Sequence, residues 1–204
     1  DILYENIFLI VAFKPPFLLV HDDGNNQDTL QARVNGYLQL NQNKYPAQAI
    51  HRIDYETSGL VLFCKHPFFQ AYCDKNMEEH HIKKEYIALV QGHTNYKNKK
   101  IISNIARDRH NAKKMIIHPN GKESISIFNT IKNYKDCSLI QVTILTGRKH
   151  QIRVQCASLN HPILNDSLYG GKMTDDTGLL LQSHHIQFND VDITCPQEKR
   201  FIRK

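Results

Sequence analysis

One short segment combines residue types that could carry out a reaction. Residues 51–62 read HRIDYETSGLVL: a basic pair, one carboxylate, a Thr-Ser-Gly turn and then an apolar run. A turn at the mouth of a sheet is a common place for a reactive side chain. An ionised carboxylate there could act as a nucleophile, as a stabiliser of a cation, or as a base. The pattern makes Asp54 the candidate reactive group and leaves these three roles open.

A second carboxylate, Glu56, lies two residues from Asp54. This spacing raises the alternative of a hydrolase, such as a nuclease or glycosidase, which usually needs a carboxylate pair or a metal cluster. No further acidic cluster supports these two residues. The His pairs at 80–81 and 184–185 are adjacent in sequence, and neighbours on a strand point to opposite faces, so one pair rarely chelates. We therefore expect no metal site and regard the hydrolase as the weaker interpretation.

The elements that must position Asp54 are predicted to form an α+β fold with a mixed, mainly antiparallel sheet and flanking helices. Strand-like segments tend to follow one another rather than alternate with helices. An apolar run at residues 59–65 predicts a buried strand directly after the turn. Apolar residues at four-residue spacing predict an amphipathic helix at 29–40. Further strands are expected at 7–13, 17–20, 85–92, 124–133, 138–146 and 179–188, helical segments at 67–80 and after the loop that starts at 147, a polar turn at 22–26, and a loop at 94–100.

The composition describes an ordinary globular chain with an excess of positive charge. Its 204 residues, 41% of them hydrophobic, predict a single domain over residues 1–204. The net charge of +6 favours polyanionic partners such as RNA. Five Cys residues without a C-x-x-C pair indicate reduced, buried thiols. The longest apolar run has about seven residues, far short of a span, and no basic signal sequence opens the chain. We expect a cytoplasmic monomer that does not bind a membrane.

The segment around Asp54 resembles the signature H-R-L-D-x-x-T-S-G-L of the RluA-type ribosomal RNA pseudouridine synthases, with Ile53 in place of Leu. Residues 13–21 (FKPPFLLVH) resemble the family's N-K-P-x-G-L-x-V-H, with Phe13 and Phe17 as departures. The resemblance continues in order along the chain at residues 84–92 (K-x-Y-x-A-x-V-x-G), 113–124, 146–154 (T-G-R-T-H-Q-I-R-V) and 161–170 (H-P-I-L-x-D-x-x-Y-G). Gln182 stands where relatives carry a His, which is a further departure from the family pattern. No small N-terminal RNA-binding domain is recognised within the chain.

The resemblance implies the pseudouridine synthase catalytic fold and the isomerisation of uridine to pseudouridine in RNA. It assigns the catalytic carboxylate to Asp54, an ionic partner of that carboxylate to Arg153, and the aromatic platform for the flipped base to Tyr86. Purely structural interpretations are a surface charge for Arg153 and sheet packing for Tyr86. Because the reaction neither oxidises the base nor consumes water, no cofactor is expected.

The same resemblance suggests which residues meet the RNA. Arg52 is placed to fill the space that the flipped nucleotide leaves, and His51 is expected to hold the loop by hydrogen bonding. The candidate RNA-binding residues are His51, Arg52, Lys14, Lys113, Lys114, Arg148, Lys149 and His150. Each basic side chain could instead be a solvated charge.

The substrate and the activity itself leave alternatives within this family. The basic connection at 113–124 favours large-subunit ribosomal RNA, and transfer RNA is the alternative because the core motifs are shared. A catalytically inactive RNA-binding protein on the same fold is a further alternative. The presence of Asp54, Tyr86 and Arg153 together argues against it.

Overall fold

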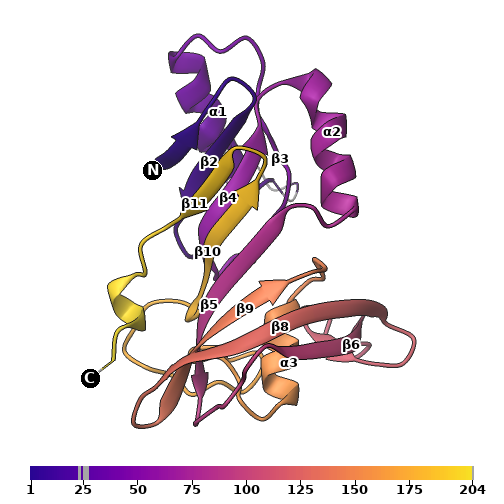
Figure 1. Cartoon of the computed structure of the whole chain (residues 1–204), viewed down its shortest axis with the longest axis vertical. Coiled ribbons are helices and arrows are strands. Elements are labelled where there is room, and N and C mark those ends of the chain that lie inside the picture. The colour runs from indigo at the N-terminus through magenta and orange to yellow at the C-terminus, as the bar shows by residue number, and fades with distance from the viewer. Residues whose placement is uncertain (23, 25–27, 204) are drawn as a thin grey trace. The chain divides into compact units, whose positions relative to one another are not determined.

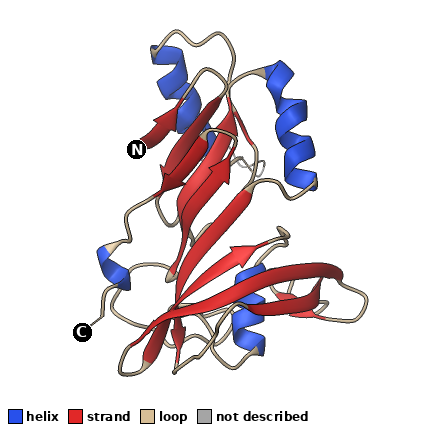
Figure 2. Ribbon diagram, in the orientation of Figure 1, coloured by secondary structure: helices blue, strands red, loops and turns tan. Residues whose placement is uncertain are grey.

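The computed structural model describes residues 1–22, 24 and 28–203, which fold as a strand-rich α+β protein (Figures 1 and 2). The predicted fold class is confirmed: most of the strand pairs are antiparallel, and helices flank the strands. No helix of the described residues is both long and apolar enough to cross a membrane. The elements are β1 (Ile2–Glu5), β2 (Leu9–Lys14), α1 (Leu30–Leu40), β3 (Gln48–Ala49), β4 (Ser58–Cys64), α2 (Pro67–Glu78), β5 (Lys83–Gln91), β6 (Lys99–Arg107), β7 (Met115–Ile117), β8 (Lys122–Asn133), β9 (Cys137–Ile144), α3 (Gln151–Ser158), β10 (Leu181–Phe188), β11 (Val191–Thr194) and a 3-10 turn, η1 (Lys199–Phe201).

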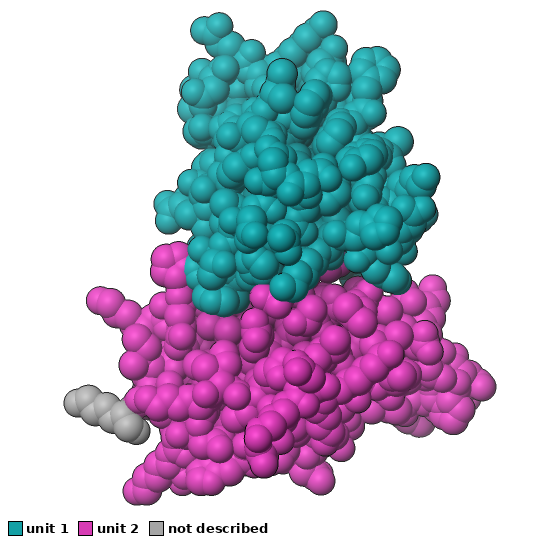
Figure 3. Space-filling view, viewed as in Figure 1, with its two compact units in different colours: residues 1–83, 183–195 teal, residues 84–182, 196–204 magenta. Residues whose placement is uncertain are grey.

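The chain divides into two compact units, unit 1 with residues 1–83 and 183–195 and unit 2 with residues 84–182 and 196–204 (Figure 3). The prediction of a single domain over residues 1–204 stays a prediction. Because β10 returns late in the sequence to unit 1, that unit is discontinuous in the chain.

In unit 1 the strand order is β1-β2-β4-β10, with β3 on β4 and β11 on β10. All seven residues of β4 are buried, which is why its sequence is continuously apolar rather than alternating. Helix α1 packs on β2 and α2 packs on β4. Thr29 caps α1 by accepting a hydrogen bond from the Ala32 backbone N, and the predicted apolar face of this helix is buried.

In unit 2 the strand order is β5-β9-β8-β6-β7, and α3 contacts β6 and β7. Buried side chains along β5 and β9 face one another across the pairing, with Tyr86 opposite Val142 and Ala88 opposite Ile140. All five Cys side chains of the chain are buried and unbridged, as predicted.

Two predicted elements are wrong. Residues 17–20 are not a strand, because two prolines remove backbone donors and Phe17 then takes a left-handed conformation with φ +61°. The predicted loop at 94–100 ends early, since β6 already begins at Lys99. Most of the predicted turn at 22–26 lies outside the described residues.

Candidate active site

Asp54 lies on the turn that leads into the buried strand β4 of unit 1. Its backbone carbonyl accepts a hydrogen bond from the Thr57 N at 3.1 Å, and the side chain is half-buried. The next residue is tied down as well, because the Tyr55 carbonyl accepts from the Phe17 N at 2.8 Å. The turn is therefore anchored at its own hydrogen bond, at the 15–18 segment and at the rigid strand that follows it.

Position 59, directly after the turn, can be occupied only by glycine. Its φ is +113°, and a Cβ at this position would lie 2.1 Å from the Ser183 carbonyl oxygen of β10. No other residue type accepts both the conformation and the close approach. The Gly of the T-S-G motif thus lets β10 pass directly against the start of β4.

Lys14 supports the Asp54 turn through hydrogen bonds from its side chain to backbone carbonyls. The side chain is fully buried, and Nζ donates to the carbonyls of Pro15 (3.0 Å), Leu18 (2.8 Å) and Tyr55 (3.1 Å). Three acceptors match the three N–H groups of an ammonium. The predicted phosphate contact of Lys14 is therefore wrong, because its donors are committed to the backbone inside the fold.

Burial lowers the pKa of Lys14 from 10.5 to about 8, while the neighbouring negative charges of Asp54 and Glu56 act in the opposite direction. The charge of Asp54 is thus felt by a buried cation of the same unit. A positive charge therefore lies close to the carboxylate of Asp54 within unit 1.

His51 and Arg52 take opposite orientations. His51 is buried, and its Nε2 accepts a hydrogen bond from the Leu62 backbone N at 3.2 Å. This is the loop-holding hydrogen bond that we expected, and it does not support the grouping of His51 with the RNA-binding residues. Arg52 is exposed, so its side chain is accessible to RNA.

Tyr86 lies on β5 of unit 2 and is 6% exposed. Its place opposite Val142 in the β5–β9 ladder agrees with the packing that any strand tyrosine would have. Its predicted role as a platform for the flipped base stays a prediction.

Arg153 is a buried residue of α3, which removes its interpretation as a surface charge. Nε donates to Asp166 Oδ2 and Nη2 donates to Asp166 Oδ1, both at 2.8 Å, and the two side chains are 3% and 0% exposed. Such a fork-to-fork pair fixes the plane of the guanidinium as well as its place. The predicted pairing of Arg153 with Asp54 stays a prediction.

The sequence analysis missed Asp166, the partner of Arg153. The motif H-P-I-L-x-D-x-x-Y-G does not indicate that its Asp binds an arginine. An Asp so close to a run of apolar residues could have been noticed as a partner for a buried cation. Its neighbour Asn165 is held in turn: Nδ2 donates to the carbonyls of Asp176 (2.9 Å) and Gly178 (3.1 Å).

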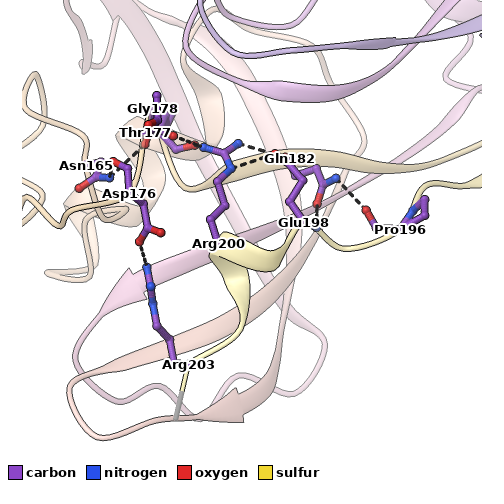
Figure 4. Close-up of polar contacts among 10 residues, drawn as sticks. Asn165, Asp176, Thr177, Gly178, Gln182, Pro196, Glu198, Arg200 and Arg203 are labelled. Atoms are coloured by element: carbon purple, nitrogen blue, oxygen red, sulfur yellow. Dashed lines mark hydrogen bonds and ion pairs between the residues drawn. The ribbon is translucent and has the colours of Figure 1, made fainter. Parts of the chain in front are cut away.

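The C-terminal segment also contacts the loop at residues 176–179, to which Asn165 donates (Figure 4). Arg203 forms an ion pair with Asp176 at 2.5 Å, and Arg200 Nη1 donates to the carbonyls of Thr177 and Leu179. Gln182, the residue that replaces the family His, donates from Nε2 to the Pro196 carbonyl at 3.1 Å. In this chain the Gln therefore docks the C-terminal segment.

The start of α3 is set by Gln151, the Gln of the T-G-R-x-H-Q motif. Its Oε1 accepts from the Thr146 hydroxyl (2.9 Å) and from the Arg148 backbone N (3.0 Å), and its Nε2 donates to the Ser126 hydroxyl (2.8 Å). A buried amide with donors and acceptors satisfied holds its position well. It fixes the path of the basic residues 148–150, which lie between β9 and α3.

The remaining basic candidates gather on two loops of unit 2. Lys113 and Lys114 precede β7, and Lys113 is exposed. Arg148 and Lys149 precede α3 and are both exposed. His150 is half-buried in the left-handed conformation. His150 is turned inward onto Tyr169, and Arg148 Nε donates to the Glu123 carbonyl at 2.9 Å. The phosphate contacts of these five residues stay predictions.

Comparison with known proteins identifies the fold and the family. Residues 8–158 match the family model described as RNA pseudouridylate synthase. The chain is 35% identical over 174 residues to the uncharacterised RNA pseudouridine synthase YhcT of Bacillus subtilis, covering 84% of this chain and 58% of that one. It is 36% identical over 182 residues to the ribosomal large subunit pseudouridine synthase C of Buchnera aphidicola, covering 85% and 55%. It thus spans little more than half the length of these two relatives.

Among solved structures, the human RNA pseudouridylate synthase domain containing 1 superposes with a TM-score of 0.82 at 23% identity, covering 97% of this chain and 83% of that one. The fold of the two proteins is therefore the same. The family match takes in the Asp54 turn, the Tyr86 strand and Arg153. The chain belongs to the RNA pseudouridylate synthase family.

Proposed function

We propose that this protein converts specific uridines of structured RNA into pseudouridine, with Asp54 as its catalytic carboxylate. The C1′–N1 glycosidic bond breaks, the uracil turns, and a C1′–C5 bond forms. The proton on C5 leaves, and N1 gains a proton, so the reaction is an isomerisation that calls for no redox partner. The family match over residues 8–158, with Asp54 in its anchored turn, is the observation that carries the proposal.

The surroundings of Asp54 support its role. The carboxylate must be ionised to act as a nucleophile, a cation stabiliser or a base. The buried Lys14 ammonium in the same unit favours that ionised form. In our proposal Arg153 pairs with the Asp54 carboxylate, as the resemblance implies, and its fork contact with Asp166 supports this because it pre-orients the guanidinium. Tyr86 stacks on the flipped base, and Arg52 occupies the vacated space in the RNA.

We propose large-subunit ribosomal RNA as the substrate. The similarity to the Buchnera ribosomal large subunit pseudouridine synthase C supports this choice, as does similarity to a ribosomal large subunit pseudouridine synthase D of Borreliella burgdorferi, 31% identical over 211 residues. The exposed cations Lys113, Arg148 and Lys149 provide phosphate contacts in this proposal. Action as a monomer in the cytoplasm completes the proposal.

A tritium-release assay tests the proposal. Ribosomal and transfer RNA transcripts are labelled at C5 of uridine and incubated with wild-type protein, with Asp54→Asn and with Glu56→Gln. The last variant removes the neighbouring carboxylate of the same turn and serves as the matched control. Release by wild type and Glu56→Gln, with none by Asp54→Asn, is the expected result. The RNA that releases tritium names the substrate class.

Other outcomes overturn parts of the proposal. RNA binding without release by the wild type would favour the binding-protein alternative. Loss of release in Glu56→Gln alone would move the chemistry to the other carboxylate. Free uracil or cut RNA would instead indicate a hydrolase.

A further inference from the structure

Tyr169 joins two basic loops that are far apart in the sequence. Its Oη accepts a hydrogen bond from the Met115 backbone N at 2.8 Å, at the start of β7. The same oxygen lies 2.9 Å from Nδ1 of His150, directly before α3. A tyrosine hydroxyl can accept one hydrogen bond and donate another. One atom therefore ties the loop that ends at Lys114 to the loop that carries Arg148 and Lys149.

The ring of Tyr169 has a separate set of partners. The Lys114 ammonium lies 5.5 Å from the ring centroid, and the Arg153 guanidinium carbon lies 5.2 Å from it. Both distances fall within the range of cation–π attraction. The ring thus contacts one cation of the basic loop and the buried arginine whose Nε and Nη2 donate to Asp166.

The contact between the Tyr169 hydroxyl and His150 lies at an unusual backbone conformation. This residue has φ +54°, a left-handed conformation that costs a non-glycine residue free energy and needs compensation. Its side chain offers no cap to α3, and its ring turns edge-on to Tyr169, with centroids 5.7 Å apart. The hydroxyl of Tyr169 therefore supports the strained position from which the chain leaves Lys149 and enters α3.

We propose that Tyr169 is a positioning residue with two separable tasks, a proposal that rests on the proposed function. Its hydroxyl sets the spacing between the Lys113–Lys114 loop and the Arg148–Lys149 loop, so that both meet the phosphate backbone of one RNA. Its ring supports the Arg153 guanidinium, which lies over it. Because the hydroxyl can be removed without the ring, variants that lose the hydroxyl alone or both groups should differ in their kinetic effects.

Tyr169→Phe keeps the ring and removes the hydroxyl. In multiple-turnover tritium release on an unmodified large-subunit ribosomal RNA transcript, we expect KM to rise about tenfold, the scale of effect for losing the two hydrogen bonds of this hydroxyl. We expect kcat to stay within about twofold. Because fewer cations then reach phosphates, the slope of log binding constant against log salt should become shallower by about one.

Tyr169→Leu removes the ring as well. We expect the same rise in KM and, in addition, a fall of about tenfold in kcat, because Arg153 loses one of its supports. Tyr134 provides the matched control: it is another tyrosine of unit 2 with a lysine over its ring, Lys132 at 5.0 Å. Tyr134→Phe and Tyr134→Leu should change neither parameter.

Filter binding of the same transcript, which does not depend on turnover, separates this proposal from the proposed function. If wild type binds the RNA without tritium release, the proposed function fails, and the affinity and salt slope of Tyr169→Phe still test the positioning role. An unchanged affinity and slope in Tyr169→Phe would overturn the proposal. So would equal losses of kcat in Tyr169→Phe and Tyr169→Leu, since hydroxyl and ring would then not act separately.

Discussion

Replacing Lys14 by Met removes a buried cation while keeping much of the length of the side chain. The ammonium donates to the carbonyls of Pro15, Leu18 and Tyr55. In Lys14→Met all three carbonyls lose the ammonium as a donor, while the Tyr55 carbonyl keeps its hydrogen bond from the Phe17 N. An unsatisfied buried acceptor costs about 1–3 kcal/mol. Relief from burying a charge offsets part of this loss. We expect the free energy of unfolding at pH 7 to fall by about 2 kcal/mol.

The pH dependence of this loss follows from the pKa of Lys14, which is about 8 in the folded protein against an ordinary lysine value of 10.5. Between these values the unfolded chain binds more protons than the folded one, so stability rises with pH. The contribution is fully present above pH 10.5 and is lost as pH falls through 8. From about pH 7 to about pH 9.5 the wild type should gain about 2 kcal/mol that Lys14→Met does not gain.

Urea unfolding of both proteins at a series of pH values across this range measures the difference directly. Other titrating groups cancel in the subtraction because both proteins carry them. Lys149→Met, which removes an exposed lysine, should follow the wild type at every pH. A constant difference between wild type and Lys14→Met would refute the reasoning, since it would mean that the three carbonyls keep the ammonium charged and outweigh its burial.

Three further substitutions test other contacts. Asp166→Asn leaves the buried guanidinium of Arg153 without its carboxylate and should lower the free energy of unfolding by about 3–5 kcal/mol; a loss below about 1 kcal/mol in urea titration would disprove the buried pair. Gly59→Ala forces a Cβ to 2.1 Å from the Ser183 oxygen and should cost about 3 kcal/mol or prevent folding; a melting temperature equal to that of the wild type would contradict this close approach. Gln182→Ala should release the C-terminal segment, so limited proteolysis should cleave after residue 196 faster than in the wild type, and an unchanged rate would rule out this docking role.

Local patterns were sufficient to predict much of this protein. The four-residue spacing of Leu30, Val34 and Leu38 predicts α1, and the unbroken apolar run predicts the buried strand β4. Both signals arise from neighbours in the chain, because helix and strand periodicity depend only on which residues share a face. The order of the motifs likewise leads to the family and to Asp54.

Partners that come from distant parts of the chain could not be predicted in this way. Lys14 has the same charge as Lys149, and the sequence suggests a phosphate contact for either one. Only burial separates them: Lys14 is enclosed and bonded to three carbonyls, and Lys149 is exposed. Whether a charge meets solvent depends on how strands pack, which a short pattern does not specify.

The residue types at Asp54, Tyr86 and Arg153, and the turn, strand or helix that carries each, follow from the amino-acid sequence because they depend on local chemistry and periodicity. The partners that orient them were decided by tertiary structure. Asp166 lies 13 residues from Arg153, and Tyr169 connects Met115 with His150, which are 35 residues apart. Directional hydrogen bonds and ion pairs form only between atoms that folding brings within about 3 Å, so their pairing emerges from the packed fold.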